Sequence, residues 1–271
     1  MNPLSPHQIE QFVQQGHIIL RGCFSREAAA PLVDDAWRQL GYDRDDASTW
    51  DEPLKFLRPS FETSLQSLSP LLWGALQQLA GGADRVNGSD RSVGQWVVNL
   101  WRGRDEVWAP PSPQVKGWHV DGTFFRHFLD SPEQGLLVTP LFSDVASRGG
   151  GTVFAPDSIP IVARRLAEHP EGVLLAEFGF PEIIAQCRDC REFTGEVGDV
   201  AIFHPFMMHS FSQNHSGRAR FITNLCLGLR EPMQFAREDG NYSPIERAIL
   251  RGLNVESLDW KITGERETFQ D

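Results

Sequence analysis

Short apolar runs separated by turn signals dominate the chain from about residue 92 onward, and they constrain the fold more than any other feature. The runs suited to strands are 92–101, 135–145, 152–155, 192–194, 200–203 and 220–229. Turn-forming residues lie between them, as at 149–151, 198–199 and 214–217. Because the runs do not alternate regularly with helices, the pattern argues against a doubly wound parallel sheet. It favours an antiparallel barrel or a double-sheet jelly roll with helices packed outside.

The first third of the chain has the periodicity of helices. Serines that can cap a helix, and glycines that can end one, delimit amphipathic segments at about 5–16, 25–37 and 69–82. A short apolar run at 17–20 is a strand candidate, and 160–168 is a further helix candidate. The N-terminal helices are therefore expected to form a layer outside the β-rich part.

Charge narrows the partners that the chain can have. The sequence holds 25 Lys and Arg against 36 Asp and Glu, a net charge of −11, with no basic stretch. This balance excludes nucleic acid and an anionic membrane surface as expected partners. No apolar run approaches the roughly 20 residues that span a bilayer, and the first residues lack the pattern of a secretory signal. We expect a cytoplasmic protein that acts on a small molecule.

The four cysteines do not form the framework of a disulfide-stabilised fold. Only Cys187 and Cys190 lie close together, and we interpret them as two thiols in an irregular segment. A zinc site would need two further ligands nearby, and a redox pair is the other alternative.

The segment Trp118-His119-Val120-Asp121-Gly122 carries the sharpest chemical signal. On extended backbone an imidazole and a carboxylate two residues apart project to the same side, so both can bind one metal ion. Composition alone gives about one such pair by chance, and His169-Pro170-Glu171 is a second. That second pair lies at a helix end and is expected at the surface. His119 and Asp121 instead lie among aromatic residues, where a carboxylate needs a partner.

A third ligand must come from far along the chain. His209 follows the apolar run 200–203, and the run from Arg220 follows the turn at 214–217. A hairpin centred on this turn would put His209 and Arg220 on neighbouring strands, with Cβ atoms about 5 Å apart. Arg218 shares that face, so periodicity leaves the choice of arginine open. Two histidines and one carboxylate form the facial triad of non-haem iron(II) oxygenases, and an arginine nearby would hold a carboxylate.

Residues near these segments are candidates for substrate contact. Asn99 and Trp101 share one face of a predicted strand, and Phe125 and Arg126 closely follow Asp121. An aromatic pocket with a cation beside it would suit a small organic substrate.

Together these residues give the chain a resemblance to the phytanoyl-CoA dioxygenase-like family of Fe(II)- and 2-oxoglutarate-dependent oxygenases. Four segments carry it: 4–20, 118–122, 149–156 and 198–220. One departure is the sequence Pro156-Asp157-Ser158-Ile159, where many members have Pro-Gly-Ser-His.

The resemblance implies that His119, Asp121 and His209 bind iron and that Arg220 binds the far carboxylate of 2-oxoglutarate. It implies a double-stranded β-helix in a single domain of 1–271, with helices of about 1–90 on a core of about 92–229. A C-terminal helix and tail of 230–271 follow that core.

The implied reaction consumes O2 and 2-oxoglutarate, releases succinate and CO2, and oxidises a C–H bond. Asp121 favours hydroxylation, because halogenating relatives lack this carboxylate. The alternatives are a cupin-like metal enzyme that does not use 2-oxoglutarate, or a non-catalytic member that binds a small molecule.

Overall fold

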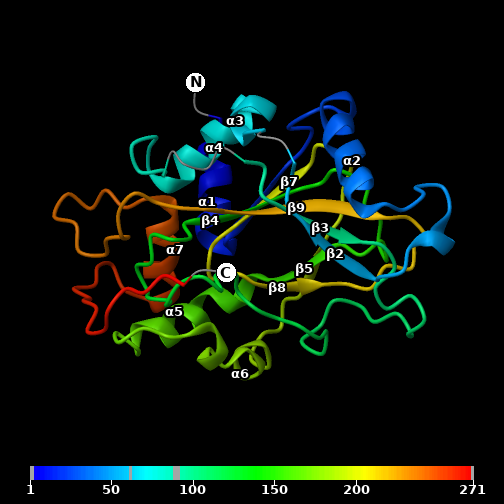
Figure 1. Ribbon diagram of the computed structural model, residues 1–271. Helices are drawn as coiled ribbons and strands as arrows, with labels where there is room; N and C mark the ends of the chain where they lie inside the picture. The colour runs from blue at the N-terminus through cyan, green and yellow to red at the C-terminus, as the bar shows by residue number, and fades with distance from the viewer. Residues whose placement is uncertain (1–2, 61–62, 88–91, 270–271) are drawn as a thin grey trace.

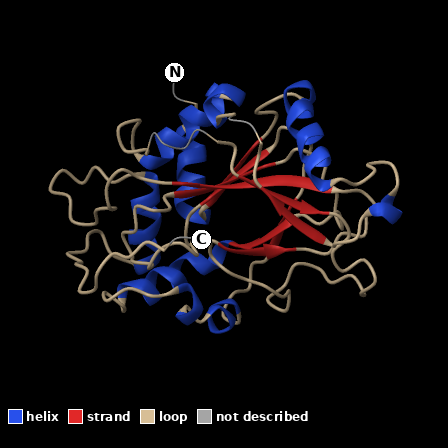
Figure 2. Cartoon of the chain, in the orientation of Figure 1, coloured by secondary structure: helices blue, strands red, loops and turns tan. Residues whose placement is uncertain are grey.

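Two antiparallel sheets face each other at the centre of the protein, and helices lie outside them (Figure 1). The computed structural model describes residues 3–60, 63–87 and 92–269. The strands are β1 (His17–Leu20), β2 (Leu54–Leu57), β3 (Gln95–Asn99), β4 (Leu136–Pro140), β5 (Thr152–Ala155), β6 (Arg191–Phe193), β7 (Val200–Phe203), β8 (Met208–Phe211) and β9 (Arg220–Leu227). The α-helices are α1 (Pro6–Gln15), α2 (Arg26–Leu40), α3 (Leu65–Leu68), α4 (Pro70–Ala80), α5 (Ile159–Ala167), α6 (Phe180–Ile184) and α7 (Pro244–Leu253). This arrangement confirms the predicted mainly-β jelly roll with flanking helices (Figure 2).

The larger sheet has the strand order β1-β7-β4-β9-β3-β2. Within it Arg220 of β9 lies opposite Asn99 of β3. The next residue, Phe221, packs its ring 5.1 Å from that of Trp37 on α2, outside the sheet. Because side chains alternate along a strand, Arg220 points the other way, into the space between the sheets.

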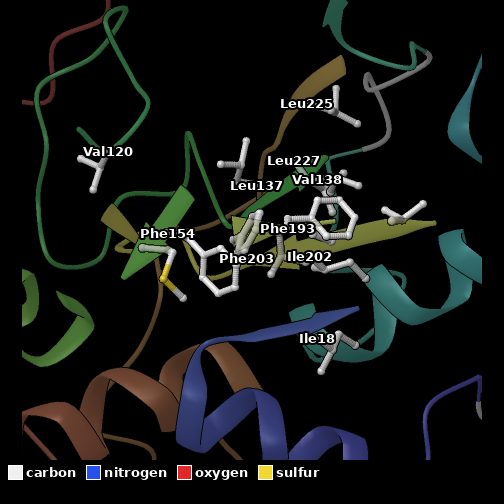
Figure 3. Close-up of a cluster of buried hydrophobic side chains, with 14 of the residues drawn as sticks. Ile18, Val120, Leu137, Val138, Phe154, Phe193, Ile202, Phe203, Leu225 and Leu227 are labelled. Atoms are coloured by element: carbon white, nitrogen blue, oxygen red, sulfur yellow. The ribbon is translucent and has the colours of Figure 1, made fainter. Parts of the chain in front are cut away.

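The smaller sheet has the order β6-β5-β8. Phe154 of β5 lies opposite His209 of β8. Its ring centroid is 4.9 Å from that of Phe203 on β7, in the larger sheet. Figure 3 shows Phe154 and Phe203 close together between the strands, with Phe193 beside them. The side of the smaller sheet that carries His209 therefore faces the larger sheet.

The outer helices join the two ends of the chain. Ser5 and Gln8 cap α1 reciprocally, and Gly16 ends it in the left-handed region at φ 67°. Helix α7 packs against α1 and α5, and Arg247 on α7 forms an ion pair with Glu10 on α1 at 2.7 Å. No helix in the described part of the chain has both the length and the apolar character needed to cross a membrane.

The predicted hairpin between the strands of His209 and Arg220 is wrong. β8 pairs with β5 in the smaller sheet, whereas β9 pairs with β3 and β4 in the larger one. The Asn214 side chain, in the turn between them, donates to the carbonyls of Asn99 at 2.9 Å and Arg218 at 2.7 Å. These bonds fix the turn against the end of β3, so the chain crosses from one sheet to the other.

Three predicted strands are shorter than expected, and β2 has no counterpart among the predictions. The strand expected over 220–229 ends two residues early, at Leu227. The strand expected over 92–101 begins at Gln95, after Gly94 in the left-handed region at φ 97°. The strand expected over 135–145 ends at Pro140, which has no N–H to continue the ladder.

A buried carboxylate anchors the C-terminal helix, and it gives a pH-dependent prediction. Glu246 is 0% exposed and accepts hydrogen bonds from Arg85 at 2.7 and 3.1 Å. Burial alone would raise the pKa of Glu246, but the hydrogen bonds from Arg85 and from backbone amides outweigh it and hold the pKa at about 2. Because the folded pKa lies below the unfolded value, Glu246 stabilises the fold above about pH 4.5, and this stabilisation is lost as pH falls toward 2.

Glu246→Gln is expected to lower the free energy of unfolding at pH 7 by about 3 kcal/mol, because Arg85 would keep its charge without a counter-ion. Urea unfolding at pH 7 and at pH 3.5 measures this difference, which should shrink at the lower pH. Replacement of the exposed Glu256 by glutamine is the control. A difference that stays constant between the two pH values would contradict the assignment.

Candidate metal centre

His119 and His209 lie side by side although they are far apart in sequence. The His119 amide donates to the His209 carbonyl at 3.0 Å, and the His209 amide donates back at 2.9 Å. The segment around His119 therefore extends the smaller sheet beside β8. Asp121, two residues later, brings its carboxylate to the same place. The three ligand atoms all lie within 4.8 Å of one another.

Hydrogen bonds on the far side of each imidazole fix which nitrogen faces the carboxylate. Nδ1 of His119 donates to the Gly117 carbonyl at 2.7 Å, and Nδ1 of His209 donates to the Met207 carbonyl at 3.1 Å. A carbonyl only accepts, so a neutral ring carries its proton on Nδ1 and its lone pair on Nε2. Both Nε2 atoms lie 3.4 Å from Oδ1 of Asp121. Donor atoms thus converge from three side chains.

The converging atoms fit a divalent cation. Nε2 of His209 and Oδ2 of Asp121 are buried and make no hydrogen bond to any described residue. Burial would raise the pKa of the Asp121 carboxyl, but the positive charge that His209 and His119 carry when protonated outweighs it and holds the pKa well below its usual range. A charged carboxylate beside two imidazole nitrogens suits Fe(II) and leaves coordination positions open.

Arg220 is a buried cation without a counter-ion. It is 1% exposed, and Nη1 donates to the Val97 carbonyl at 3.3 Å. Nε and Nη2 have no hydrogen-bond partner among the described residues. Burial lowers the pKa of the guanidinium to about 9, and no carboxylate in the described part of the chain offsets this effect. Burying an unpaired charge costs free energy, and an anion that reached Nε and Nη2 would offset this cost.

Asn99 and Trp101 lie in the walls around this region. Asn99 is 0% exposed, donates to the Ser212 carbonyl at 3.1 Å and accepts from the Arg102 amide at 3.1 Å. Trp101 is half-buried and donates to the Trp50 carbonyl at 2.9 Å. Asn99 thus connects β3 to the end of β8. The predicted substrate contacts of Asn99 and Trp101 stay predictions.

Phe125 and Arg126 are both engaged by the protein itself. The Phe125 ring is buried, with its centroid 4.3 Å from that of His127. The Arg126 guanidinium forms an ion pair with Glu267 at 2.6 Å. The Arg126 charge therefore has a partner within the protein, and the predicted substrate contacts of Phe125 and Arg126 stay predictions.

His127 holds the loop after Asp121 from inside, a role that the sequence did not reveal. Its Nε2 donates to the Gly122 carbonyl at 2.8 Å. Burial lowers the pKa of His127 to about 4, so the ring is neutral. Gly122 has φ 118°, and a Cβ there would lie 2.5 Å from the Phe125 ring. Only glycine allows this tight turn next to Asp121.

The C-terminal segment 263–269 braces the same loop from outside. Two backbone hydrogen bonds join the segments, from Arg126 to Glu267 at 2.9 Å and from Phe269 to Phe124 at 2.6 Å. Sequence reasoning missed this contact because the tail has no periodic pattern of its own.

A chain that ends at Ile262 is expected to bind Fe(II) about tenfold more weakly, because groups that orient ligands typically contribute 10–100-fold to metal affinity. Anaerobic calorimetry measures the affinity, and limited chymotrypsin digestion should cut the loop at Phe124 or Phe125. A chain that ends at Phe269 keeps both backbone hydrogen bonds and is the control. Unchanged affinity in the shorter chain would show that the tail has no part in shaping the site.

The other candidate metal ligands do not assemble in this way. His169 bonds to Glu171 at 2.8 Å, and both are partly exposed, as expected for a surface pair. Burial raises the pKa of Cys187 to about 12 and that of Cys190 to about 11. Within residues 3–60, 63–87 and 92–269, the one cluster of three metal-binding side chains is His119, Asp121 and His209. A zinc site at the two cysteines therefore lacks the further ligands that it needs.

The fold and the three converging side chains define the class of jelly-roll proteins with a two-histidine, one-carboxylate site. Within this class, the chain is 23% identical over 231 residues to the ectoine dioxygenase of Bordetella bronchiseptica, covering 79% of this chain and 71% of that protein. No family model matches the chain.

A solved structure shows the same fold. The non-heme alpha ketoglutarate dependent carbocyclase SnoK from nogalamycin biosynthesis superposes with a TM-score of 0.51 at 16% identity, covering 98% of this chain and 97% of that one. EctD from S. alaskensis, with 2-oxoglutarate and 5-hydroxyectoine, gives a TM-score of 0.49 at 19% identity, covering 83% of this chain and 76% of that one. The similarity to SnoK confirms the fold, and the sequence similarity to an ectoine dioxygenase agrees with the resemblance to phytanoyl-CoA dioxygenase-like oxygenases.

Proposed function

We propose that the protein is an Fe(II)- and 2-oxoglutarate-dependent dioxygenase that hydroxylates a C–H bond of a small organic molecule. The observation that carries this proposal is the buried Arg220, which has no counter-ion in the part of the chain that the structure describes and points into the same space between the sheets as His209. A metal site alone would not need this cation. A dicarboxylate that binds the metal at one end needs a cation at the other.

The relatives support the same reaction. The curated relative is named an ectoine dioxygenase, and SnoK is described as alpha ketoglutarate dependent. We extend to this chain the dioxygenase activity that the first name gives and the alpha ketoglutarate dependence that the second gives, but not the substrates of these proteins.

In the proposed mechanism, His119, Asp121 and His209 hold the iron. The Gly117 and Met207 carbonyls keep both Nε2 atoms aimed inward through their bonds to Nδ1. When bound, iron with 2-oxoglutarate and O2 supplies the oxidation of the C–H bond, with release of succinate and CO2.

Arg220 orients the co-substrate. Its free Nε and Nη2 are available for a bidentate pair with the far carboxylate of 2-oxoglutarate. The buried rings of Phe154 and Phe203 fill the interior beyond His209, so water is excluded from that side.

We also propose that residues 1–271 form one oxygenase domain and that it works in the cytoplasm. The contact between α1 and α7 supports a single domain, because it packs an N-terminal helix against the C-terminal helix. No disulfide joins the described cysteines, which is consistent with a reducing compartment.

The test of this function is succinate formation by the purified chain with Fe(II), ascorbate and 2-oxoglutarate. Slow succinate release is expected without a substrate, and none when either iron or 2-oxoglutarate is left out. Calorimetry of 2-oxoglutarate with iron present gives an independent readout. Absence of binding there would exclude the proposal and favour a cupin-like enzyme that does not use 2-oxoglutarate.

A further inference from the structure

A cavity of about 410 Å³ opens next to the metal centre, between the end of β8 and the segment 101–116. Its aromatic walls are Trp101 and Phe211, and its charged side chains are Arg102, Glu106 and Lys116. Neither the triad nor Arg220 lines it. The cavity is therefore an additional space beside the site already described.

The cavity and the metal centre share one wall. Phe211 lies two residues after His209 on β8, so both side chains project to the same side of the strand. The Phe211 ring centroid is 6.1 Å from that of His119. Ser210, which lies between His209 and Phe211 in the sequence, donates its hydroxyl to the Lys116 carbonyl at 2.7 Å. A molecule in the cavity would thus contact strand β8, which also carries His209 and pairs with the backbone of His119.

The two cations that line the cavity have no carboxylate partner in the described part of the chain. Nearby, Arg104 pairs with Asp105 at 3.7 Å. Arg102 and Lys116, in contrast, form no ion pair with any residue that the structure describes, in a chain whose net charge is −11. The Arg102 guanidinium lies 5.8 Å from the centroid of the Phe211 ring. Such a cation over an aromatic face keeps its N–H donors available for an anion.

The charge balance of the cavity selects the kind of anion. Glu106 also lines the cavity, and its carboxylate accepts from Gln213 at 3.1 Å. Two cations and one carboxylate leave a net charge of one positive unit. A single carboxylate matches this balance, whereas a doubly charged phosphate would meet repulsion from Glu106.

We propose that the substrate is a small organic carboxylate, whose anion is held by Arg102 and Lys116 and whose apolar body lies against Trp101 and Phe211. This proposal rests on the proposed function, because it places the substrate of that reaction in the cavity beside the metal centre. The carbon to be oxidised then lies on the side of the molecule nearer Phe211, which is the wall shared with His119.

The test uses benzoate, 3-phenylpropionate, indole-3-acetate and octanoate, each compared with its uncharged amide. Calorimetry with the purified full chain, without metal or 2-oxoglutarate, measures binding, and succinate release with both present measures coupling. We expect at least one acid to bind at least about tenfold more tightly than its amide and to accelerate succinate release. Arg102→Ala and Lys116→Ala should each remove most of this preference.

Arg148→Ala is the matched control, since this guanidinium also lies over an aromatic ring, 4.7 Å from Trp108, but does not line the cavity. If no acid is preferred over its amide, or if Arg148→Ala removes the preference as fully as Arg102→Ala, the proposal is overturned. Preferred binding of an acid by a chain that does not bind 2-oxoglutarate would instead refute the proposed function while leaving the carboxylate site in place.

Discussion

Arg220→Ala is expected to weaken the binding of 2-oxoglutarate by roughly 100- to 1,000-fold, because removing one partner of a buried charge pair costs about 3–4 kcal/mol. Arg220 is 1% exposed and has no counter-ion among residues 3–60, 63–87 and 92–269. Without the co-substrate, the alanine variant should be at least as stable as the wild type, since a buried unpaired charge has been removed. Calorimetry with iron present measures the affinity, and thermal unfolding measures the stability.

The combination of the two readouts separates a binding role from a structural one. A structural arginine would lower stability when replaced, whereas the proposed role predicts lost binding without lost stability. Addition of 2-oxoglutarate and iron should raise the unfolding temperature of the wild type but not that of the variant. Arg218→Ala is the control, because Arg218 is exposed. Equal losses of affinity in the two variants would refute the role of Arg220.

The sequence was sufficient for the parts of the site that depend on local geometry. His119 and Asp121 are two residues apart on extended backbone, and that spacing alone predicts a shared side. The inward direction of Arg220 was also expected. Its predicted place on a strand next to that of His209 was wrong, because alternation along a strand does not say which sheet the strand joins. The crossing from β8 to β9 depends on the bonds of Asn214 to the end of β3.

Contacts between distant segments account for what the sequence did not reveal. The segment 263–269 reaches the loop after Asp121 through backbone hydrogen bonds, which leave no trace in side-chain periodicity. The ion pair between Arg126 and Glu267 likewise joins residues with no local relation. Strand β2, with an exposed Phe56, lacks the buried apolar run that marks the central strands.

His119→Ala is expected to lower the affinity for Fe(II) by at least about 100-fold, more than the loss of an outer partner of a ligand typically costs. The variant would leave two of three converging donors, His209 and Asp121, and succinate formation should fall to background. His169→Ala is a closely matched control, because His169 also precedes an acidic residue by two positions and contacts it, at 2.8 Å from Glu171. The two variants differ in whether a third donor converges on the pair.

Anaerobic calorimetry with Fe(II) compares the two variants directly, and circular dichroism establishes that both are folded. The backbone bridge between His119 and His209 uses main-chain atoms only, so the alanine variant can retain it. Loss of iron binding with an intact fold therefore reports the imidazole rather than the strand pairing. Full iron affinity in His119→Ala would show that the converging donors are a hydrogen-bonded core cluster, and the assignment of the metal centre would have to be abandoned.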